Sequence, residues 1–287
     1  MQILANLSVN LFKAPSHLQR PAAMEETLAC LLLLLLSSSS EKYVYVDQRM
    51  SWLEAQTHCR THYTDLAAVC SKQDTEHIQK LASKIDGFIW MGMEKFSTGG
   101  VKWMWSGGAE VTEFFWKEGQ PENRTNEYSS LIQMDGWRDS HSHYSFPFFC
   151  FRVVVVRERK TWEDALDHCR ELHLDLASIN SETEMLLIQS ELGKHVTSEH
   201  VWIGLHFFPD GWRWVDGRPL EYEAWREEIR PACPRLSMSC AALQVTGGAA
   251  ALVDTTGGTG VSSTAAGVNQ RVWKPHDCED RLHFVCY

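Results

Sequence analysis

Cysteines are the side chains of this sequence with the widest choice of chemistry. Two of them, Cys59 and Cys169, each follow a histidine, and a thiol beside a basic side chain is a pattern that can serve as a nucleophile. That chemistry needs a free thiolate, which a disulfide-bonded cysteine cannot supply. The compartment of the mature chain therefore bears on whether these thiols react or form bridges. The nine cysteines are Cys30, Cys59, Cys70, Cys150, Cys169, Cys233, Cys240, Cys278 and Cys286.

The start of the sequence predicts a secreted protein. An unbroken apolar run of nine residues, Leu28–Leu36, precedes four serines. Its length suits the core of a signal peptide and falls well short of the roughly 20 residues that span a bilayer. We expect Met24 to be the natural start, residues 1–40 to be an N-terminal extension and signal peptide, and no anchor to follow unless a longer parent chain has one. Cys30 is then removed, and eight cysteines remain for disulfides.

Composition and motifs exclude two classes of function. The net charge of −10 and the pI of about 5.7 oppose nucleic-acid binding, which needs clustered lysines and arginines. The chain has no G-x-S-x-G or H-E-x-x-H motif and no recognisable catalytic carboxylate pair. We therefore expect a binding protein rather than an enzyme. The 12 tryptophans are expected to be core residues.

One phrase occurs twice, at a constant offset of 110 residues. Residues 51–60 read SWLEAQTHCR and residues 161–170 read TWEDALDHCR; Asp-Leu-Ala follows each at the same distance, at 65–67 and 175–177. The period is too long for a solenoid repeat and is about one domain in length. The sequence therefore predicts two homologous domains in tandem, at residues 41–151 and 152–287.

Each repeat is predicted to open as strand, helix, helix and to continue as short strands and turns. The helix starts rest on Ser or Thr capping patterns, and the strands rest on β-branched or aromatic runs. The segments in the two copies are opening strands at 43–46 and 153–156, first helix starts at Ser51 and Thr161, second helix starts at Ser71 and Ser181, and closing strands at 148–150 and 284–286. Residues 246–268 are low in complexity and nearly uncharged, so they are expected to be a flexible insertion in the second domain or a retained intron.

The order of these motifs resembles the C-type lectin-like domain. The pattern Trp-x-x-Ala-x-x-x-Cys, then Asp-Leu-Ala, Trp-Ile-Gly-Leu, Trp-x-Trp and a terminal Cys occurs in the second copy, and a close variant occurs in the first. The arrangement is similar to tandem lectin-like proteins related to the macrophage mannose receptor. The resemblance implies an α+β fold for each domain, with two helices, two small antiparallel sheets and a long loop that holds the ligand site.

The resemblance also implies how the cysteines pair. It joins the first helix of each domain to the last strand through Cys59–Cys150 and Cys169–Cys286, and it adds Cys240–Cys278 in the second domain. Loops of this size give bridges worth very roughly 4–5 kcal/mol. The matching positions of the first domain are Ser129 and Ser142, so that domain lacks the second bridge. Cys70 and Cys233 are left to pair with each other, to pair between chains or to stay free.

In this family a calcium ion binds the sugar, and the first domain has an imperfect copy of its ligands. The resemblance assigns candidate oxygen ligands to Gln120, Glu122, Glu127 and Asp139, around a cis proline at Pro121. Arg138 stands where the family has a ligand amide, and we expect it to pair with Glu122 or Glu127 and to replace the ion. Calcium is therefore a candidate cofactor of the first domain only, and otherwise no cofactor is expected.

The second domain lacks the ligand pattern, since Trp225 is followed by residues 226–231 without an acid–proline–amide motif, and Lys274 and Pro275 occupy the later positions. Asn123 begins an N-glycosylation sequon within the loop of the first domain. The sequence thus predicts an extracellular recognition protein for a glycan or a protein ligand, acting in innate immunity by analogy with its relatives. The alternative is a calcium-dependent carbohydrate-binding lectin that acts through the first domain.

Overall fold

The computed structural model describes residues 42–85, 87–96, 100–124, 126–172, 174–196, 198–226, 230–232, 235–246 and 272–287. The expected signal peptide, Cys233 and nearly all of the expected insertion lie outside these residues. The described residues form one compact unit that contains both repeats. Within the described residues, no helix is both long and apolar enough to cross a bilayer.

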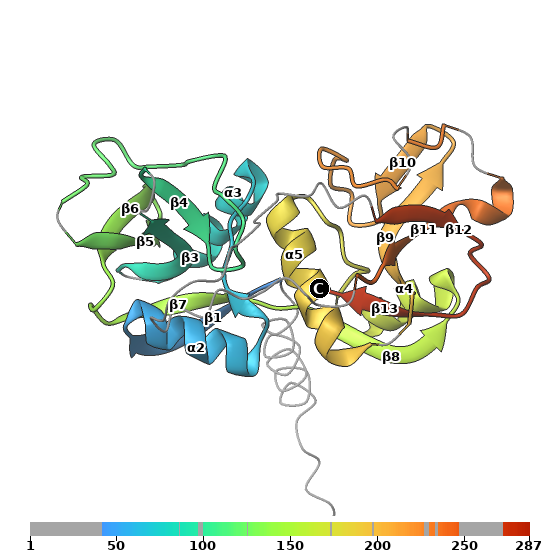
Figure 1. The fold of residues 1–287 in the computed structure, drawn as a ribbon, viewed down its shortest axis with the longest axis horizontal. Helices are drawn as coiled ribbons and strands as arrows, with labels where there is room; N and C mark the ends of the chain where they lie inside the picture. Colours follow the sequence, from blue (N-terminus) through green and yellow to red (C-terminus); the bar gives the residue numbers. More distant parts are fainter. Residues whose placement is uncertain are drawn as a thin grey trace, which may run out of the picture. The chain divides into compact units, whose positions relative to one another are not determined.

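The first repeat folds into two helices and one sheet (Figure 1). The strands run in the order β1-β7-β3-β5-β6, with β2 on β7 and β4 on β3; β3 and β7 are parallel and the other pairs antiparallel. Its elements are β1 (Tyr43–Met50), α2 (Trp52–His62), β2 (Asp65–Leu66), α3 (Lys72–Ala82), β3 (Ile89–Phe96), β4 (Lys102–Trp105), β5 (Glu127–Gln133), β6 (Gly136–His141) and β7 (Phe146–Phe151).

The second repeat has the same order of elements. Its sheet runs β12-β11-β9-β13-β8, with β10 on β9, so each strand corresponds to one in the first repeat. In both repeats the strands are joined through one central strand, β3 or β9. The elements are β8 (Val154–Lys160), α4 (Trp162–Glu171), α5 (Glu182–His195), β9 (His200–Phe208), β10 (Gly211–Trp214), the 3₁₀ turn η1 (Leu236–Met238), β11 (Cys240–Gln244), β12 (Trp273–His276) and β13 (Leu282–Cys286). The predicted tandem α+β architecture is confirmed, but each repeat has one mixed sheet instead of the two antiparallel sheets expected, because β7 pairs in parallel with β3 and β13 pairs in parallel with β9.

The predicted helix caps form. The Ser51 hydroxyl accepts from the amide of Glu54, and the Glu54 carboxylate accepts from the amide of Ser51 at 2.9 Å, which is a full capping box. At Thr161 only the first of these bonds forms, from the amide of Asp164 at 3.3 Å. The tryptophans are core residues as expected: all except Trp116 are buried.

The core needs a glycine where the central strand passes under the Asp-Leu-Ala segment. The amide of Gly204 donates to the carbonyl of Ala177 at 2.9 Å, and a Cβ on Gly204 would lie 2.4 Å from the carbonyl oxygen of Leu176. Gly92 is in the same position in the first repeat, with 2.7 Å to the carbonyl oxygen of Leu66. This close approach explains the glycine of the Trp-x-Gly pattern in both copies.

The structure forms all three disulfides that the resemblance implies: Cys59–Cys150, Cys169–Cys286 and Cys240–Cys278. Cys70 is free and half-buried. Burial and the nearby carboxylate of Glu184 raise the pKa of its thiol to about 12, so at neutral pH it is not a thiolate nucleophile.

A buried group of four charges connects the two repeats. Lys42 donates to Asp74 of α3 at 2.9 Å and to Glu184 of α5, and Arg218 of the second repeat donates to Asp74 at 3.2 Å. The side chains of Lys42, Asp74 and Glu184 are at most 4% exposed. We call these four residues the ionic cluster.

Candidate ligand-binding loop

The loop that precedes β5 in the first repeat contains two of the four sequence-predicted ligands, Gln120 and Glu122. It begins at Trp116, which bridges to Trp137 of β6; the amide of Lys117 donates to the carbonyl of Trp137 at 3.0 Å. The Gln120–Pro121 peptide bond is cis, as the resemblance implies. Asn123 has a φ of 51°, in the left-handed region that asparagine tolerates better than most residues. Strands β5 and β6 supply Glu127 and Asp139 beside the loop.

Asp139 holds the tip of this loop through the backbone. One of its carboxylate oxygens accepts from the amide of Glu122 at 2.9 Å, and the other accepts from the amide of Asn123 at 2.8 Å. Asp139 is buried, so its charge is satisfied by two charge-assisted hydrogen bonds in a low-dielectric setting. Both of its oxygens therefore already have a role in shaping the loop.

The remaining predicted ligands are also engaged. Glu127 is buried and accepts from the amide of Arg124 at 3.0 Å. Glu122 accepts from the side-chain amide of Gln120 at 3.0 Å and pairs with the Arg124 guanidinium. The structure thus brings Gln120, Glu122 and Asp139 together directly, and it links Glu127 to them through Arg124.

The expected partner of Arg138 was wrong. Arg138 does not pair with Glu122 or Glu127; it donates to both carboxylate oxygens of Asp135 at 3.1 Å and lies 5.4 Å from the centre of the Phe88 ring. Alternate residues of a strand face opposite sides of the sheet, so Arg138 of β6 points away from the face on which Asp139 contacts the loop. Hydrogen bonds from Lys117 and Arg138 lower the pKa of Asp135 from its usual value. The cation that neutralises Glu122 is Arg124.

The side chains that the resemblance assigns to a calcium ion are engaged with other protein groups in this structure. Calcium needs six to eight oxygens around one point, whereas the carboxylates of Glu122, Glu127 and Asp139 each already accept a hydrogen bond from a neighbouring amide. Both oxygens of Asp139 face amide hydrogens instead. The one acceptor that matches a ligand role is the buried side-chain oxygen of Gln120, which has no hydrogen-bond partner among the described residues.

The second repeat positions its loop in the same way but with different side chains. Trp225 bridges to Trp273 as Trp116 does to Trp137, which places Lys274 and Pro275 at the positions of Arg138 and Asp139. Neither the lysine ammonium of Lys274 nor the proline ring of Pro275 has a side-chain oxygen that could bind a calcium ion. His206 lies near the sulfurs of Cys240 and Cys278, but these are bridged and are not thiolate ligands.

An aromatic surface beside the loop was not predicted from the sequence. The Lys95 ammonium lies 5.5 Å from the centre of the Trp103 ring and 5.6 Å from that of Tyr128, which is 40% exposed. Trp116 packs on Trp103 at 5.2 Å, and Phe114 stacks on Trp116 at 5.9 Å. We call these five residues the aromatic surface. They come from β3, β4, β5 and the start of the loop, and no single sequence window contains them.

The fold and the loop define a lectin-like recognition domain in two copies, and comparison with known proteins agrees. The model of the Lectin C-type domain matches residues 48–152 and 158–287. The chain therefore belongs to the C-type lectin domain family. The match covers both repeats described above.

The relatives are large proteins of which this chain resembles a small part. The human C-type mannose receptor 2 is 23% identical over 213 residues, which are 61% of this chain and 14% of the receptor. The rabbit (Oryctolagus cuniculus) secretory phospholipase A2 receptor is 21% identical over 277 residues, which are 83% of this chain and 17% of that receptor. A crystal structure of human lithostathine matches 38% of this chain and 81% of its own, with 21% identity and a TM-score of 0.36.

Proposed function

We propose that this chain is an extracellular recognition protein that binds a carbohydrate or protein ligand through its first domain without calcium. The observation behind the proposal is the pair of hydrogen bonds from the amides of Glu122 and Asn123 to Asp139. These hydrogen bonds let the Asp139 carboxylate fix the shape of the loop, so an ion is not needed to organise it. No group of the loop is assigned a catalytic role.

The cost of recruiting Asp139 to an ion supports this reading. Calcium would have to displace two hydrogen bonds to a charged acceptor, each worth about 1.5–3 kcal/mol. Their sum, about 3–6 kcal/mol, corresponds to a loss of roughly 10²–10⁴ in calcium affinity. Arg124 adds a second obstacle, because it pairs with Glu122, another of the four candidate ligands.

The aromatic surface supplies a contact area for a ligand. Its exposed rings are Phe114 and Tyr128, and exposed aromatic rings with an adjacent cation are typical of binding sites, since they bury much apolar area at low entropic cost. The names of the relatives include a sugar, mannose, and a protein, phospholipase A2. Asn123 is exposed, and a glycan there would lie next to the same loop; this is a proposed modification.

A calcium-dependent carbohydrate site in the first domain is the second candidate. It is favoured by the buried, unpartnered oxygen of Gln120, which is the kind of acceptor that a hard cation binds. It requires Asp139 to release the two amides. A calcium titration separates the two candidates directly.

The test uses the secreted tandem chain after removal of N-glycans. Mannosylated albumin and a secretory phospholipase A2 are the probes, and binding is measured by surface plasmon resonance with calcium or with EDTA, alongside calorimetric titration of calcium alone. We expect no calcium heat, and binding of one probe in both buffers that falls about tenfold in Tyr128→Ala. Tyr144→Ala, an exposed tyrosine outside the aromatic surface, is the control. Binding lost in EDTA together with a calcium heat would establish the second candidate instead.

A further inference from the structure

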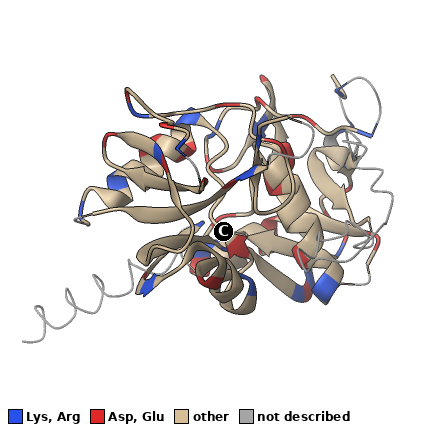
Figure 2. Ribbon diagram, turned by 60° about the vertical axis from the view of Figure 1, so that its left-hand side comes forward, with Lys and Arg blue, Asp and Glu red and all other residues tan. Residues whose placement is uncertain are grey.

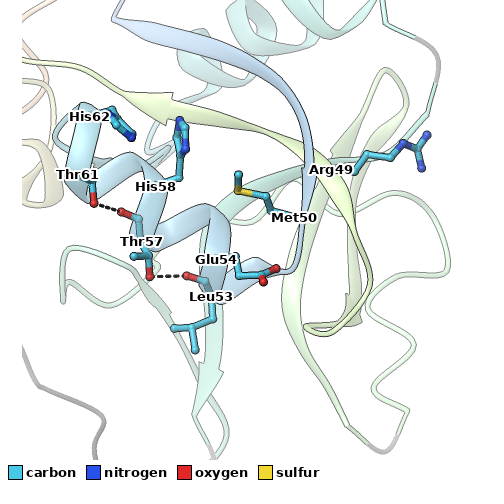
Figure 3. Close-up of a pocket in the computed structure, with 8 residues that line it drawn as sticks. All are labelled: Arg49, Met50, Leu53, Glu54, Thr57, His58, Thr61 and His62. Carbon is cyan, nitrogen blue, oxygen red and sulfur yellow. Dashed lines mark hydrogen bonds between the residues drawn. The ribbon is translucent and has the colours of Figure 1, made fainter.

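An open groove of about 550 Å³ runs along α2, and none of its lining residues belongs to the ligand-binding loop (Figure 3). The end of β1 and one face of the helix form it. Its lining consists of Arg49, Met50, Leu53, Glu54, Thr57, His58, Thr61 and His62.

Two histidines lie side by side in this groove. Residues four apart on a helix share a face, and the rings of His58 and His62 are 4.5 Å apart between centres with an interplanar angle of 50° (Figure 3). His58 is half-buried and packs edge-on against Phe148 at 5.3 Å, which restricts its ring; His62 is exposed. Neither imidazole has a hydrogen-bond partner or an ion pair in the described part of the chain.

The other polar side chains of the groove are already engaged. The hydroxyls of Thr57 and Thr61 donate to carbonyls four residues earlier, at 2.9 and 2.7 Å. Glu54 closes the capping box. Figure 3 shows Arg49 extending away from the histidines, so its charge does not face the rings. The two imidazoles are therefore the available nitrogen ligands of the groove.

We propose that His58 and His62 form a binding site for a divalent transition-metal ion, with water completing the coordination. Imidazole nitrogens suit copper(II), nickel(II) and zinc(II), and affinity among these ions is generally highest for copper(II). The site is separate from the calcium question, since hard calcium selects oxygen and this pair offers nitrogen.

The second repeat provides a natural comparison. His168 of α4 packs edge-on against Phe284 at 5.3 Å, just as His58 packs against Phe148. The position that corresponds to His62 is Leu172, which is 48% exposed. The second repeat therefore has the first imidazole in the same setting without the second, and it should not bind the ion at this position.

The experiment titrates copper(II) alone into the tag-free tandem chain and follows both the binding heat and the imidazole NMR signals. We expect the signals of His58 and His62 to broaden at substoichiometric copper, while that of His168 does not. His62→Leu, which copies the second repeat at an exposed position, should weaken this binding at least tenfold. Thr61→Ala in the same groove is the control and should leave the affinity unchanged.

Two results would overturn the site. One is an unchanged copper affinity in His62→Leu; the other is broadening of His168 at the same copper concentration as His58. The unfolding midpoint of His62→Leu is measured in parallel, and a native midpoint with the affinity lost shows that the ligand, and not the fold, was removed.

Discussion

Lys42→Met is the substitution that tests most directly how the two repeats are held together. Lys42 is 4% exposed and contacts Asp74 of the first repeat and Glu184 of the second. Burial alone lowers the pKa of Lys42, but the two carboxylates outweigh it, and the net pKa is raised, so the side chain is charged when folded. Methionine has nearly the same shape and no charge.

The magnitude follows from the charges that remain. The ionic cluster has two cations and two carboxylates, and in the variant Arg218 is its remaining cation; Arg218 contacts Asp74 at 3.2 Å and also pairs with Asp216 at 3.3 Å. Removing one partner of a buried ion pair costs about 3–5 kcal/mol, because the other charge stays buried and unpaired. For a unit of this size each kcal/mol shifts the melting temperature by roughly 2–4 °C, so we expect a decrease of about 6–20 °C.

The assay is equilibrium unfolding in urea and by heat, followed by tryptophan fluorescence. Lys72→Met is the matched control: Lys72 is 79% exposed, lies 3.8 Å from Glu76, and should cost no more than about 1 kcal/mol. The double variant Lys42→Met/Glu184→Gln removes one charge of each sign and should regain most of the lost stability. A Lys42→Met variant no less stable than the Lys72→Met control would refute the reasoning, as would a double variant that regains nothing.

Three further predictions follow from single contacts. Gly204→Ala should cost about 1–3 kcal/mol in urea unfolding, because the new Cβ meets the carbonyl of Leu176 at 2.4 Å; an unchanged midpoint would contradict this. Burial raises the pKa of Asp74, but Lys42 and Arg218 outweigh burial, and the net pKa is lowered from 3.8. The ionised Asp74 therefore stabilises the fold above pH 3.8, and this stabilisation is lost as the pH falls further. Unfolding measured across pH 2–6 tests this. Arg138→Asn should leave the calorimetric response to calcium unchanged, since Arg138 pairs with Asp135 and not with a candidate calcium ligand; new calcium binding would show the opposite.

Features that depend on local pattern were predictable from the sequence. The helices begin at the predicted caps Ser51 and Thr161, because capping needs only side chains within four residues. The repeated motif predicted two equivalent domains, and the structure gives them equivalent sheets. The cysteine pairs came from the family resemblance, since spacing alone leaves many connectivities open.

Features that depend on distant contacts were not predictable. The ionic cluster joins Lys42 to Glu184 across 142 residues, and nothing in either local sequence indicates a buried charge. The direction of Arg138 depends on which face of β6 its position occupies and on Asp135 and Phe88, which lie on that side. A motif alignment gives the order of residues along the strand, but it does not show which face of the sheet each side chain occupies.

The two repeats hold equivalent regions by different means. The amide of Trp52 donates to the carbonyl of Ser142 at 2.9 Å, and the amide of Trp162 donates to that of Cys278 at 2.9 Å, so Ser142 and Cys278 are equivalent. The second repeat closes this region with the covalent Cys240–Cys278 bridge, whereas the first has serine there and relies on the hydrogen bonds of Asp139. A hydrogen-bonded loop can open at a cost of a few kcal/mol, while a bridged one cannot without reduction. The region around Ser142 in the first repeat is therefore held by reversible contacts, and the region around Cys278 in the second repeat is held by a covalent bond.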